Sequence, residues 1–225
     1  MSELFIVATP IGNLEDISFR AVKTLKEVDF IICEDTRHTK ILLNRYDIQT
    51  KSLVSFHAQS SETKAMEISK RIKNGKTAAL ISDAGTPGIS DPGFKLIKFC
   101  VEKGIKLIPI PGVSAFLTLI SVSGFPIDKF YFGGFLPHKK GRQTILKNLA
   151  ESEVSQVFYE SVHRFSKLLG ELENFVGGDR KICVGRELTK LHEEIFRGTV
   201  KQAQAHFKKE NTRGEFVVLV GPKSF

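Results

Sequence analysis

The chain has 225 residues, of which 41% are hydrophobic and 26% are charged. These proportions match soluble globular proteins, so they exclude a disordered, collagen-like or coiled-coil chain, and the length leaves room for two modest domains. Lysines and arginines number 33 against 25 acidic residues, a formal net charge of +8. This excess favours an anionic partner, with plain solubility as the alternative explanation.

The sequence predicts a cytoplasmic protein without a metal site. No apolar run approaches the roughly 20 residues of a membrane span, and no basic leader precedes the first apolar stretch. H-E-x-x-H and C-x-x-C are missing, and His192 lacks the second histidine that a zinc-binding helix requires. Each cysteine lies in an apolar run, so we expect buried, reduced thiols at Cys33, Cys100 and Cys183.

The first half of the chain alternates short apolar runs with longer segments at helical spacing. A first helix is indicated by Ile17, Ala21, Leu25 and Val28. Alternating strands and helices imply a mostly parallel α/β sheet covered on both faces. We expect Pro109 and Pro111 to end the fifth strand, because proline donates nothing to a ladder. The predicted strands are residues 4–9, 30–34, 52–56, 77–83 and 106–111.

The pattern changes after about residue 115. Two of the later strands are only four residues apart, which predicts an antiparallel hairpin. We therefore expect a boundary near residues 112–124 and two domains, a five-stranded parallel α/β domain at 1–115 and a smaller mixed-sheet α/β domain at 116–225. The second carries the larger positive charge and is the better candidate for contact with phosphates. Its predicted strands, interrupted by two helices, are 130–135, 154–160, 181–188, 193–200 and 214–221.

Three loops after predicted strands have an unusual composition: TPIGN (9–13), SDAGTPGISDPG (82–93) and PIPGVSA (109–115). The carboxyl ends of parallel strands gather at one edge of a sheet, where ligands bind at the switch of strand order. Glycines let backbone amides approach a ligand, and Asp83 supplies an acceptor for an ammonium or ribose hydroxyl. Ser114 and Ala115 would open the next helix with free amides.

Together these loops suit a nucleoside with a zwitterionic tail. Ordinary turns, with Ser114 as a helix cap, are the alternative. There is no G-x-G-x-x-G after the first strand and no G-x-x-x-x-G-K-[ST] anywhere in the sequence, so ordinary dinucleotide or P-loop nucleotide binding is not expected.

A charged cluster follows the second and third strands. Glu34, Asp35 and Arg37 leave the second strand, and His57 follows the third. They would border the same edge, where they could position a hydroxyl or remove its proton. The alternative is that Asp35 or Thr36 caps a helix and Arg37 makes a surface pair.

The second half contains three charged motifs: FYESVHR (158–164), GRELTK (185–190) and HKKGR (138–142). We expect HKKGR to contact phosphate through Lys139, Lys140 and Arg142, with a solvated helix start as the alternative.

Taken together, these segments resemble the tetrapyrrole methylase superfamily and, within it, the bacterial 16S rRNA cytidine 2'-O-methyltransferases. The resembling segments follow the family's order from the first strand to the last. The twelve-residue loop is the most specific, because other branches of the superfamily have a shorter Gly-Asp-Pro version. The segments are VATPIGNLEDIS, CEDTRHTKILL, SDAGTPGISDPG, PGVSA, SGFPIDKFYFGGFLPHKKGR, FYESVHR, GRELTKLHEE and RGEFVVLVG.

The resemblance implies a homodimer of two-domain subunits, each holding S-adenosylmethionine in the cleft between its domains. It also implies methylation of the ribose of cytidine 1402 in the RNA of the small ribosomal subunit, with no role for DNA. By position, the implied cofactor contacts are Pro10, Ile11, Asp83, Ala84, Gly85, Thr86, Ser114, Ala115, Phe158, Tyr159, Glu187, Leu188, Thr212 and Gly214.

For this reaction the candidate proton acceptors are His57, Glu34 and Asp35, and Arg37 is the candidate for steering phosphate or ribose. Positioning of the two reactants without a base is the alternative. The chain departs from the family's usual pattern at residues 58–61, Val113 and Val162. It stops at Phe225, where many relatives continue, so we expect weaker RNA binding or a larger role for the dimer surface.

Two other functions are considered. One is a related enzyme acting on a porphyrin precursor or on a modified histidine of an elongation factor, against which the twelve-residue loop at 82–93 and the basic charge argue. The other is a non-enzymatic RNA-binding protein. That function would leave the three shaped loops without a purpose, and RNP-like motifs with stacking aromatics are not evident.

Overall fold

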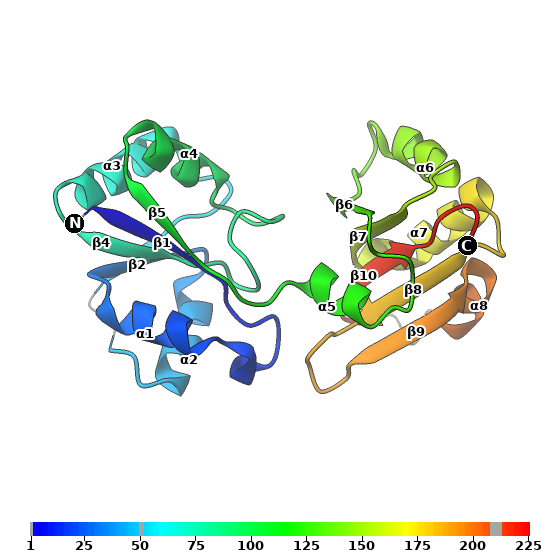
Figure 1. Ribbon diagram of the computed structural model, residues 1–225, viewed down its shortest axis with the longest axis horizontal. Coiled ribbons are helices and arrows are strands. Elements are labelled where there is room, and N and C mark those ends of the chain that lie inside the picture. The colour runs from blue at the N-terminus through cyan, green and yellow to red at the C-terminus, as the bar shows by residue number, and fades with distance from the viewer. Residues whose placement is uncertain (1, 50–51, 208–212) are drawn as a thin grey trace. The chain divides into compact units, whose positions relative to one another are not determined.

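The computed structural model describes residues 2–49, 52–207 and 213–225. It divides the chain into two compact units, Met1–Ser114 and Ala115–Phe225, each with its own sheet (Figure 1). The division falls inside the segment 112–124, where the sequence pattern changes.

The first unit is a parallel α/β domain, as the sequence predicts. Within the described residues its strands lie in the order β3-β2-β4-β1-β5, and all pairs are parallel. Its elements are β1 Glu3–Val7, η1 Leu14–Asp16, α1 Phe19–Glu27, β2 Phe30–Cys33, α2 Thr36–Arg45, β3 Leu53–Ser55, α3 Glu62–Lys73, β4 Thr77–Leu80, α4 Phe94–Glu102 and β5 Lys106–Ile110.

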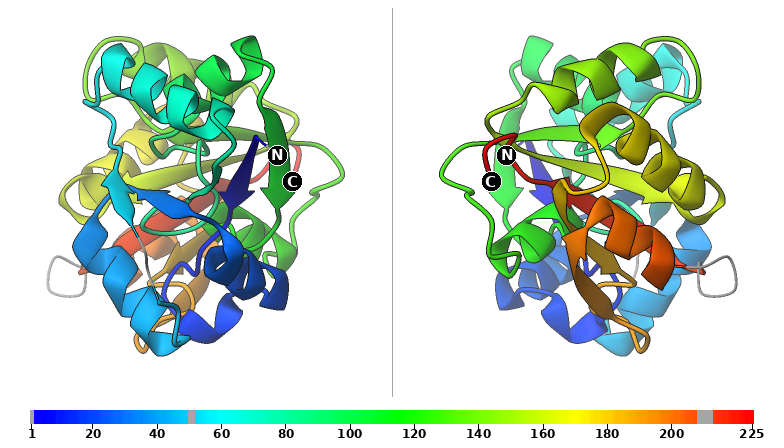
Figure 2. Two further views of the ribbon diagram at one scale, coloured as in Figure 1. Left: turned by 90° about the vertical axis from the view of Figure 1, so that its left-hand side faces the viewer. Right: turned by 90° about the vertical axis from the view of Figure 1, so that its right-hand side faces the viewer.

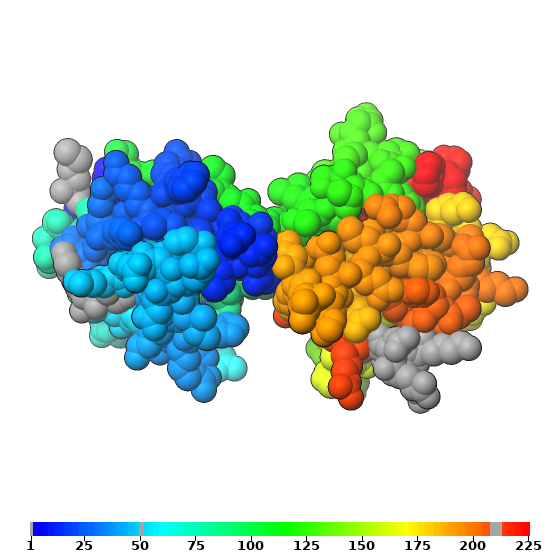
Figure 3. Space-filling view, turned by 90° about the horizontal axis from the view of Figure 1, so that it is seen from below, coloured from blue at the N-terminus to red at the C-terminus, as the bar shows by residue number. Residues whose placement is uncertain are grey.

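Helices cover both faces of this sheet. The first two crossovers run one way along the sheet and the next two run back, so right-handed connections place α1 and α2 on one face and α3 and α4 on the other (Figures 1 and 2). The outer side of α1 and α2 is seen in blue in Figure 3. Every residue of β2 is buried, which is why this strand is an unbroken apolar run.

Two hydrophobic cores follow from this arrangement. On one face Leu25 of α1 and Leu43 of α2 pack with Ile31. On the other face Ile68 and Leu96, from α3 and α4, pack in the core that contains Ile32. Because neighbouring residues of β2 serve opposite cores, the strand fixes both helix layers at once.

The fifth strand ends one residue earlier than predicted. β5 runs from Lys106 to Ile110, against the predicted 106–111, and it includes Pro109 as that range implies. β5 is an edge strand, paired only with β1 among the described strands, so the missing N–H of Pro109 costs no ladder bond on the open side. Pro111 does follow the last residue of the strand.

The second unit contains a mixed sheet in the order β6-β7-β10-β8-β9. β6 and β7 are parallel and the other pairs are antiparallel, and the predicted hairpin is confirmed as β8 and β9. Its elements are α5 Ala115–Ser121, β6 Phe130–Phe135, α6 Arg142–Ala150, β7 Ser155–Ser161, α7 Val162–Val176, β8 Lys181–Arg186, β9 Glu194–Thr199, α8 Val200–His206 and β10 Glu215–Val220.

The number of helices here was underestimated. Where two were expected between the strands, the described residues hold three, and the third, α8, has only seven residues. It begins inside the predicted strand 193–200. A capping box formed by Thr199 and Gln202 starts it, a local signal that the apolar run obscured.

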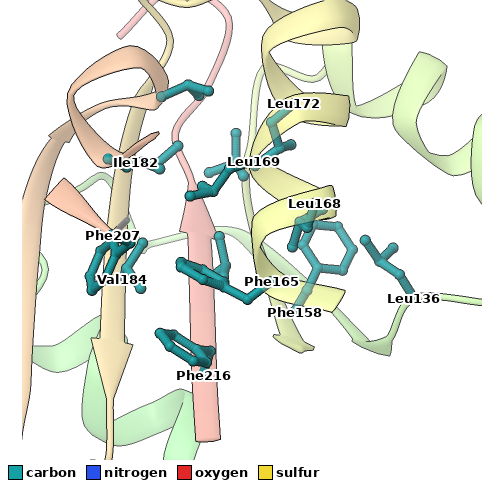
Figure 4. Packing of buried hydrophobic residues seen from close by; sticks show 14 of the residues in the cluster. Leu136, Phe158, Phe165, Leu168, Leu169, Leu172, Ile182, Val184, Phe207 and Phe216 are labelled. Atoms are coloured by element: carbon teal, nitrogen blue, oxygen red, sulfur yellow. The ribbon is translucent and has the colours of Figure 1, made fainter. Parts of the chain in front are cut away.

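The core of the second unit lies between its sheet and helices α6, α7 and α8 (Figures 1 and 2). Figure 4 shows Phe165 of α7 at its centre, stacked on Phe216 with ring centroids 3.9 Å apart and edge-on to Phe207. On the opposite face Gly185 leaves room for α5, since a Cβ atom there would lie 2.9 Å from Leu119. No described helix of either unit is long and apolar enough to span a membrane.

Candidate active site

The loops that follow β1, β4 and β5 are joined at the carboxyl edge of the first sheet. The N–H of Thr9 donates to the carbonyl of Gly85 at 2.8 Å, and the N–H of Gly85 donates back at 3.0 Å. The Thr9 hydroxyl donates to the carbonyl of Ser82 at 3.0 Å. The Thr86 hydroxyl donates to the carbonyl of Val113 at 3.2 Å. The structure therefore brings together the three loops that the sequence singled out.

Two glycines allow this close approach. Gly85 has a φ of +82°, which a residue with a side chain adopts only under strain. Gly112 lies against Ala8, and a Cβ atom at Gly112 would be 2.9 Å from the Cβ of Ala8. A side chain at either position would disturb the loop surface.

The strand order makes this edge a switch point. β4 lies between β2 and β1. The loop after β4 leads to α4 on one face, whereas the loops after β1 and β2 lead to α1 and α2 on the other. Neighbouring loops that leave for opposite faces form the switch point at which parallel α/β sheets bind ligands.

The residues expected to contact a cofactor in this unit differ in accessibility. Asp83 and Ala84 are exposed, and Thr86 is half-buried. Pro10, Ile11 and Ser114 are buried. Ala115 is the first residue of α5, as the sequence predicted. Side-chain contact with a ligand at this edge is therefore open chiefly to Asp83.

Asp83 is also the link between the β4 loop and the end of β2. Its Oδ1 accepts the backbone N–H of Asp35 at 3.1 Å, and its Oδ2 lies 4.0 Å from Nδ1 of His38. About a third of the Asp83 side chain stays exposed. The carboxylate is thus held in place while part of it faces outward.

Asp35 and Arg37 form the helix cap and surface pair that the sequence left as the alternative. Asp35 caps α2 by accepting the N–H of Arg37, and its carboxylate lies 2.6 Å from the Arg37 guanidinium, which is exposed. Hydrogen bonds from Arg37 lower the pKa of Asp35 to about 2. A carboxylate with so low a pKa is a weak base at neutral pH.

Glu34 has the opposite electrostatics. It follows β2 directly and is half-buried. Burial, together with the negative charges of Asp83 and Asp35, raises the pKa of Glu34, while the charge of His57 opposes this shift. Among the candidate proton acceptors, Glu34 is therefore the one whose surroundings favour taking up a proton.

His57 lies two residues beyond β3 in an exposed turn. Its backbone N–H donates to the Ser60 hydroxyl at 2.9 Å, and the Ser55 hydroxyl donates to the carbonyl of Glu34 at 3.3 Å. The end of β3 is thereby tied to the end of β2. No group of three or more His, Cys, Asp or Glu side chains that could hold a metal ion is found in the part of the chain that the structure describes.

In the second unit, the segments around Glu187 and Gly214 close on each other. Glu187 has a left-handed φ of 48°, and its Oε1 accepts the N–H of Glu215 at 2.9 Å and the ammonium of Lys190 at 3.0 Å. A Cβ atom at Gly214 would lie 2.5 Å from Cγ of Glu187. Sequence reasoning missed the roles of Lys190 and Glu215. Thr212, also expected to contact the cofactor, lies outside the described residues.

The other expected contacts of this unit differ in what they can offer. Phe158 is buried in the core and Leu188 is 5% exposed, so both present mainly backbone atoms. Tyr159, the next residue of β7, is half-buried and points to the other face, where its ring contacts Phe132 and Phe135. Of Phe158 and Tyr159, Tyr159 therefore has the more accessible side chain.

The structure corrects one predicted phosphate contact. Lys139 and Lys140 are exposed, but Arg142 is only 3% exposed. Its guanidinium is bonded to Glu160, Glu171 and the carbonyl of Pro137, so it is not available to a phosphate. The basic run HKKGR concealed this, because the two acidic partners lie 18 and 29 positions further along the chain.

Solved structures share this fold. Cobalt precorrin-4 methyltransferase matches with a TM-score of 0.73 over 98% of this chain and 95% of that chain, at 17% identity. A diphthine synthase matches with a TM-score of 0.72 over 97% of this chain and 89% of that chain, at 13% identity. The chain therefore shares the α/β fold of these two proteins.

The sequence comparisons identify the family. The family described as tetrapyrrole (corrin/porphyrin) methylases matches residues 3–204, and the chain belongs to it. "Ribosomal RNA small subunit methyltransferase I" of Thermotoga maritima is 48% identical over 99% of this chain and 100% of its own length. The protein of that name from Halalkalibacterium halodurans is 47% identical over 96% of this chain and 75% of its own length. The predicted resemblance is confirmed, and the chain is a methyltransferase.

Proposed function

We propose that this protein transfers a methyl group from S-adenosylmethionine to the 2'-hydroxyl of a cytidine ribose in 16S rRNA, cytidine 1402. Relatives that carry the name ribosomal RNA small subunit methyltransferase I are 42–48% identical to this chain over nearly its whole length. The structural neighbours that act in cobalamin and diphthine chemistry are only 13–17% identical. A net charge of +8 suits an RNA substrate.

The observation that carries the proposal is the joined loop surface at the edge of the first sheet. Main-chain hydrogen bonds between Thr9 and Gly85, and a bond from the Thr86 hydroxyl to the carbonyl of Val113, hold residues 82–86 and leave the Asp83 carboxylate partly exposed. Gly85 and Gly112 keep side chains out of this surface. A nucleoside with an ammonium group fits such a site, because backbone groups and a carboxylate are the partners it needs.

In this assignment Asp83 binds an ammonium or hydroxyl of the cofactor, and the loop backbone around Ala84, Gly85 and Thr86 packs on its nucleoside. Pro10, Ile11, Ser114 and Ala115 shape the same surface. Tyr159, Glu187 and Gly214 of the second unit, with the backbones of Phe158 and Leu188 and with Thr212, remain proposed contacts. When bound, the cofactor supplies an activated methyl group as a sulfonium.

The chain's own part in the chemistry is to orient the ribose hydroxyl and to take its proton. We assign proton uptake to Glu34, whose surroundings raise its pKa, with His57 beside it. Holding the hydroxyl in line with the methyl carbon supplies much of the acceleration, and a base contributes about a hundredfold or more. Arg37, exposed and charged, steers the neighbouring phosphate, and Asp35 holds Arg37 in place.

The proposal extends to the setting of the reaction. Lys139 and Lys140 contact RNA phosphates, and the protein acts as a cytoplasmic homodimer on RNA and not on DNA. These assignments rest on the sequence resemblance and on the exposure of the two lysines.

A direct experiment tests the reaction. Purified protein, radiolabelled S-adenosylmethionine and small ribosomal subunits from cells lacking this protein should give label in 16S rRNA, at a ribose 2'-oxygen of one cytidine. Label on a base, or labelling of a tetrapyrrole precursor and not of RNA, would overturn the assignment.

A second experiment tests the cofactor site. We expect Asp83→Asn to weaken S-adenosylmethionine binding by about tenfold in calorimetry, since a charge-assisted hydrogen bond is lost. Glu102→Gln is the matched control, because Glu102 ends α4 and pairs at the surface with Lys98 at 3.8 Å. Equal affinities of the two variants would remove Asp83 from the site.

A further inference from the structure

Four charged side chains form a network in the second unit that the proposed chemistry does not use. Arg142 begins α6, Glu160 lies near the end of β7, and Arg164 and Glu171 belong to α7. Glu160 is completely buried and lies 2.8 Å from the guanidinium of Arg164 and 3.4 Å from that of Arg142. Arg142 also lies 2.7 Å from Glu171. Each charge is thereby compensated.

Each of the two arginines also donates to one loop, the segment 136–141 between β6 and α6. Arg164 donates to the carbonyl of Leu136 at 2.9 Å, and Arg142 donates to the carbonyl of Pro137 at 3.2 Å. Arg142 is also the residue at which this loop enters its helix. The network therefore holds the loop at its beginning and at its end.

The tip of the same loop is exposed and cationic. Lys139 and Lys140, with His138 before them, lie between the two anchored ends, and all three side chains are exposed. A polyanion binds more tightly to cations on an ordered loop than on a free one, because less conformational entropy is lost on binding. The buried charged network and the exposed lysines thus belong to the same local structure.

We propose that Arg142, Glu160 and Arg164 are positioning residues that fix the segment 136–141 so that Lys139 and Lys140 meet the phosphates of the RNA substrate. This inference rests on the proposed function, since it concerns how that substrate is held. Stability alone does not require such a network, because buried ion pairs are often no more stabilising than apolar side chains of similar volume.

A double-mutant cycle tests the coupling. Arg142→Lys keeps the charge but loses the planar fork that reaches Glu171, Glu160 and Pro137 together. We expect it to raise KM for the small ribosomal subunit about fivefold to tenfold, with kcat and the Kd of S-adenosylmethionine unchanged. In a background with Lys139→Ala and Lys140→Ala, the same change should raise KM by less than twofold, and the salt dependence of RNA binding should already be flattened.

The chain offers a matched control in Arg180, another partly buried arginine of this unit. Its guanidinium donates to two backbone carbonyls, those of Gly221 at 3.0 Å and Ala150 at 2.7 Å. Arg180→Lys therefore removes a similar fork away from the basic loop. We expect it to leave KM for the RNA substrate unchanged.

The outcomes separate the two levels of the proposal. If the wild-type protein does not methylate the small subunit, the proposed function fails. If it does, but Arg142→Lys and the lysine changes have additive effects on KM, or Arg180→Lys raises KM equally, the positioning role fails alone. Should Arg142→Lys not fold, Arg164→Lys repeats the cycle through the carbonyl of Leu136, with the same expected and contrary results.

Discussion

The two units hold their loops by different means. At the edge of the first sheet, main-chain hydrogen bonds between Thr9 and Gly85 and the lack of side chains at glycines fix the loops. In the second unit, buried charges around Glu160 fix the segment 136–141. The first arrangement leaves exposed side chains such as Asp83 free for chemistry. In the second arrangement the local geometry depends on side-chain charge. Similar substitutions should therefore lower the free energy of unfolding by very different amounts, depending on whether the charge is buried.

The largest expected effect is therefore in the second unit. Glu160→Gln leaves the buried guanidinium of Arg142 and the partly buried one of Arg164 without their shared counter-charge, and we expect it to lower the free energy of unfolding by about 3–5 kcal/mol. Urea denaturation followed by circular dichroism measures this. Glu194→Gln is the control, because Glu194 likewise contacts two groups, Arg186 and His206, but is partly exposed, so its loss should cost about 1 kcal/mol or less. If both variants lose the same free energy of unfolding, the burial of Glu160 does not make its substitution more destabilising.

Glycine substitutions sharpen the comparison at an intermediate level. Gly214 and Gly177 both have positive φ, +108° and +89°, so an alanine at either should cost about 1 kcal/mol of stability from backbone strain. Only at Gly214 would the new Cβ also collide with Glu187; Gly177 has open space.

We expect Gly214→Ala to cost more stability than Gly177→Ala and to weaken S-adenosylmethionine binding about tenfold, since it displaces the segment of Glu187. Thermal unfolding and calorimetry on the same samples check both effects. Identical behaviour of the two variants would mean that Glu187 moves aside without consequence.

The two units also differ in how much the sequence reveals. Every strand of the first sheet was predictable, because a strand buried on both faces, such as β2, is a continuous apolar run. The three loops were predictable because glycine, proline and aspartate shape a backbone through local chemistry. The strand that contains Pro109 was predicted, but the position of β5 at the edge of the sheet, where a proline is tolerated, was not predictable from the local sequence.

In the second unit, the decisive information is distant in sequence. Lys139, Lys140 and Arg142 look alike in the run HKKGR, and only the position of Glu160 and Glu171 in the fold separates the buried cation from the exposed ones. The same holds for Glu187, whose partner Glu215 lies 28 residues away. Local patterns predict elements and turns, but they do not predict which charges a fold will bury together.

The smallest effects on stability concern two adjacent carboxylates of the first unit, Glu34 and Asp35, whose contributions should depend on pH with opposite signs. Arg37 lowers the pKa of Asp35 from 3.8 to about 2. The folded state therefore binds this proton less tightly than the unfolded chain, and the contribution of Asp35 to stability is present above pH 3.8 and lost as pH falls towards 2. Asp35→Asn, which can still cap α2, should remove this acid-side loss.

For Glu34 the sign reverses. Burial and the charges of Asp83 and Asp35 raise its pKa above the ordinary value of 4.5, so the folded state binds the proton more tightly than the unfolded chain. The stability contribution of Glu34 is then greatest at low pH and declines as pH rises from 4.5 through the raised value. Glu34→Gln should abolish that decline and, because the proton acceptor is lost, lower kcat about a hundredfold with KM little changed. Unfolding free energies of the wild-type protein and both variants, measured between pH 2 and 8, test these signs. If the differences from wild type change with pH in the same direction for Asp35→Asn and Glu34→Gln, the two carboxylates share one environment.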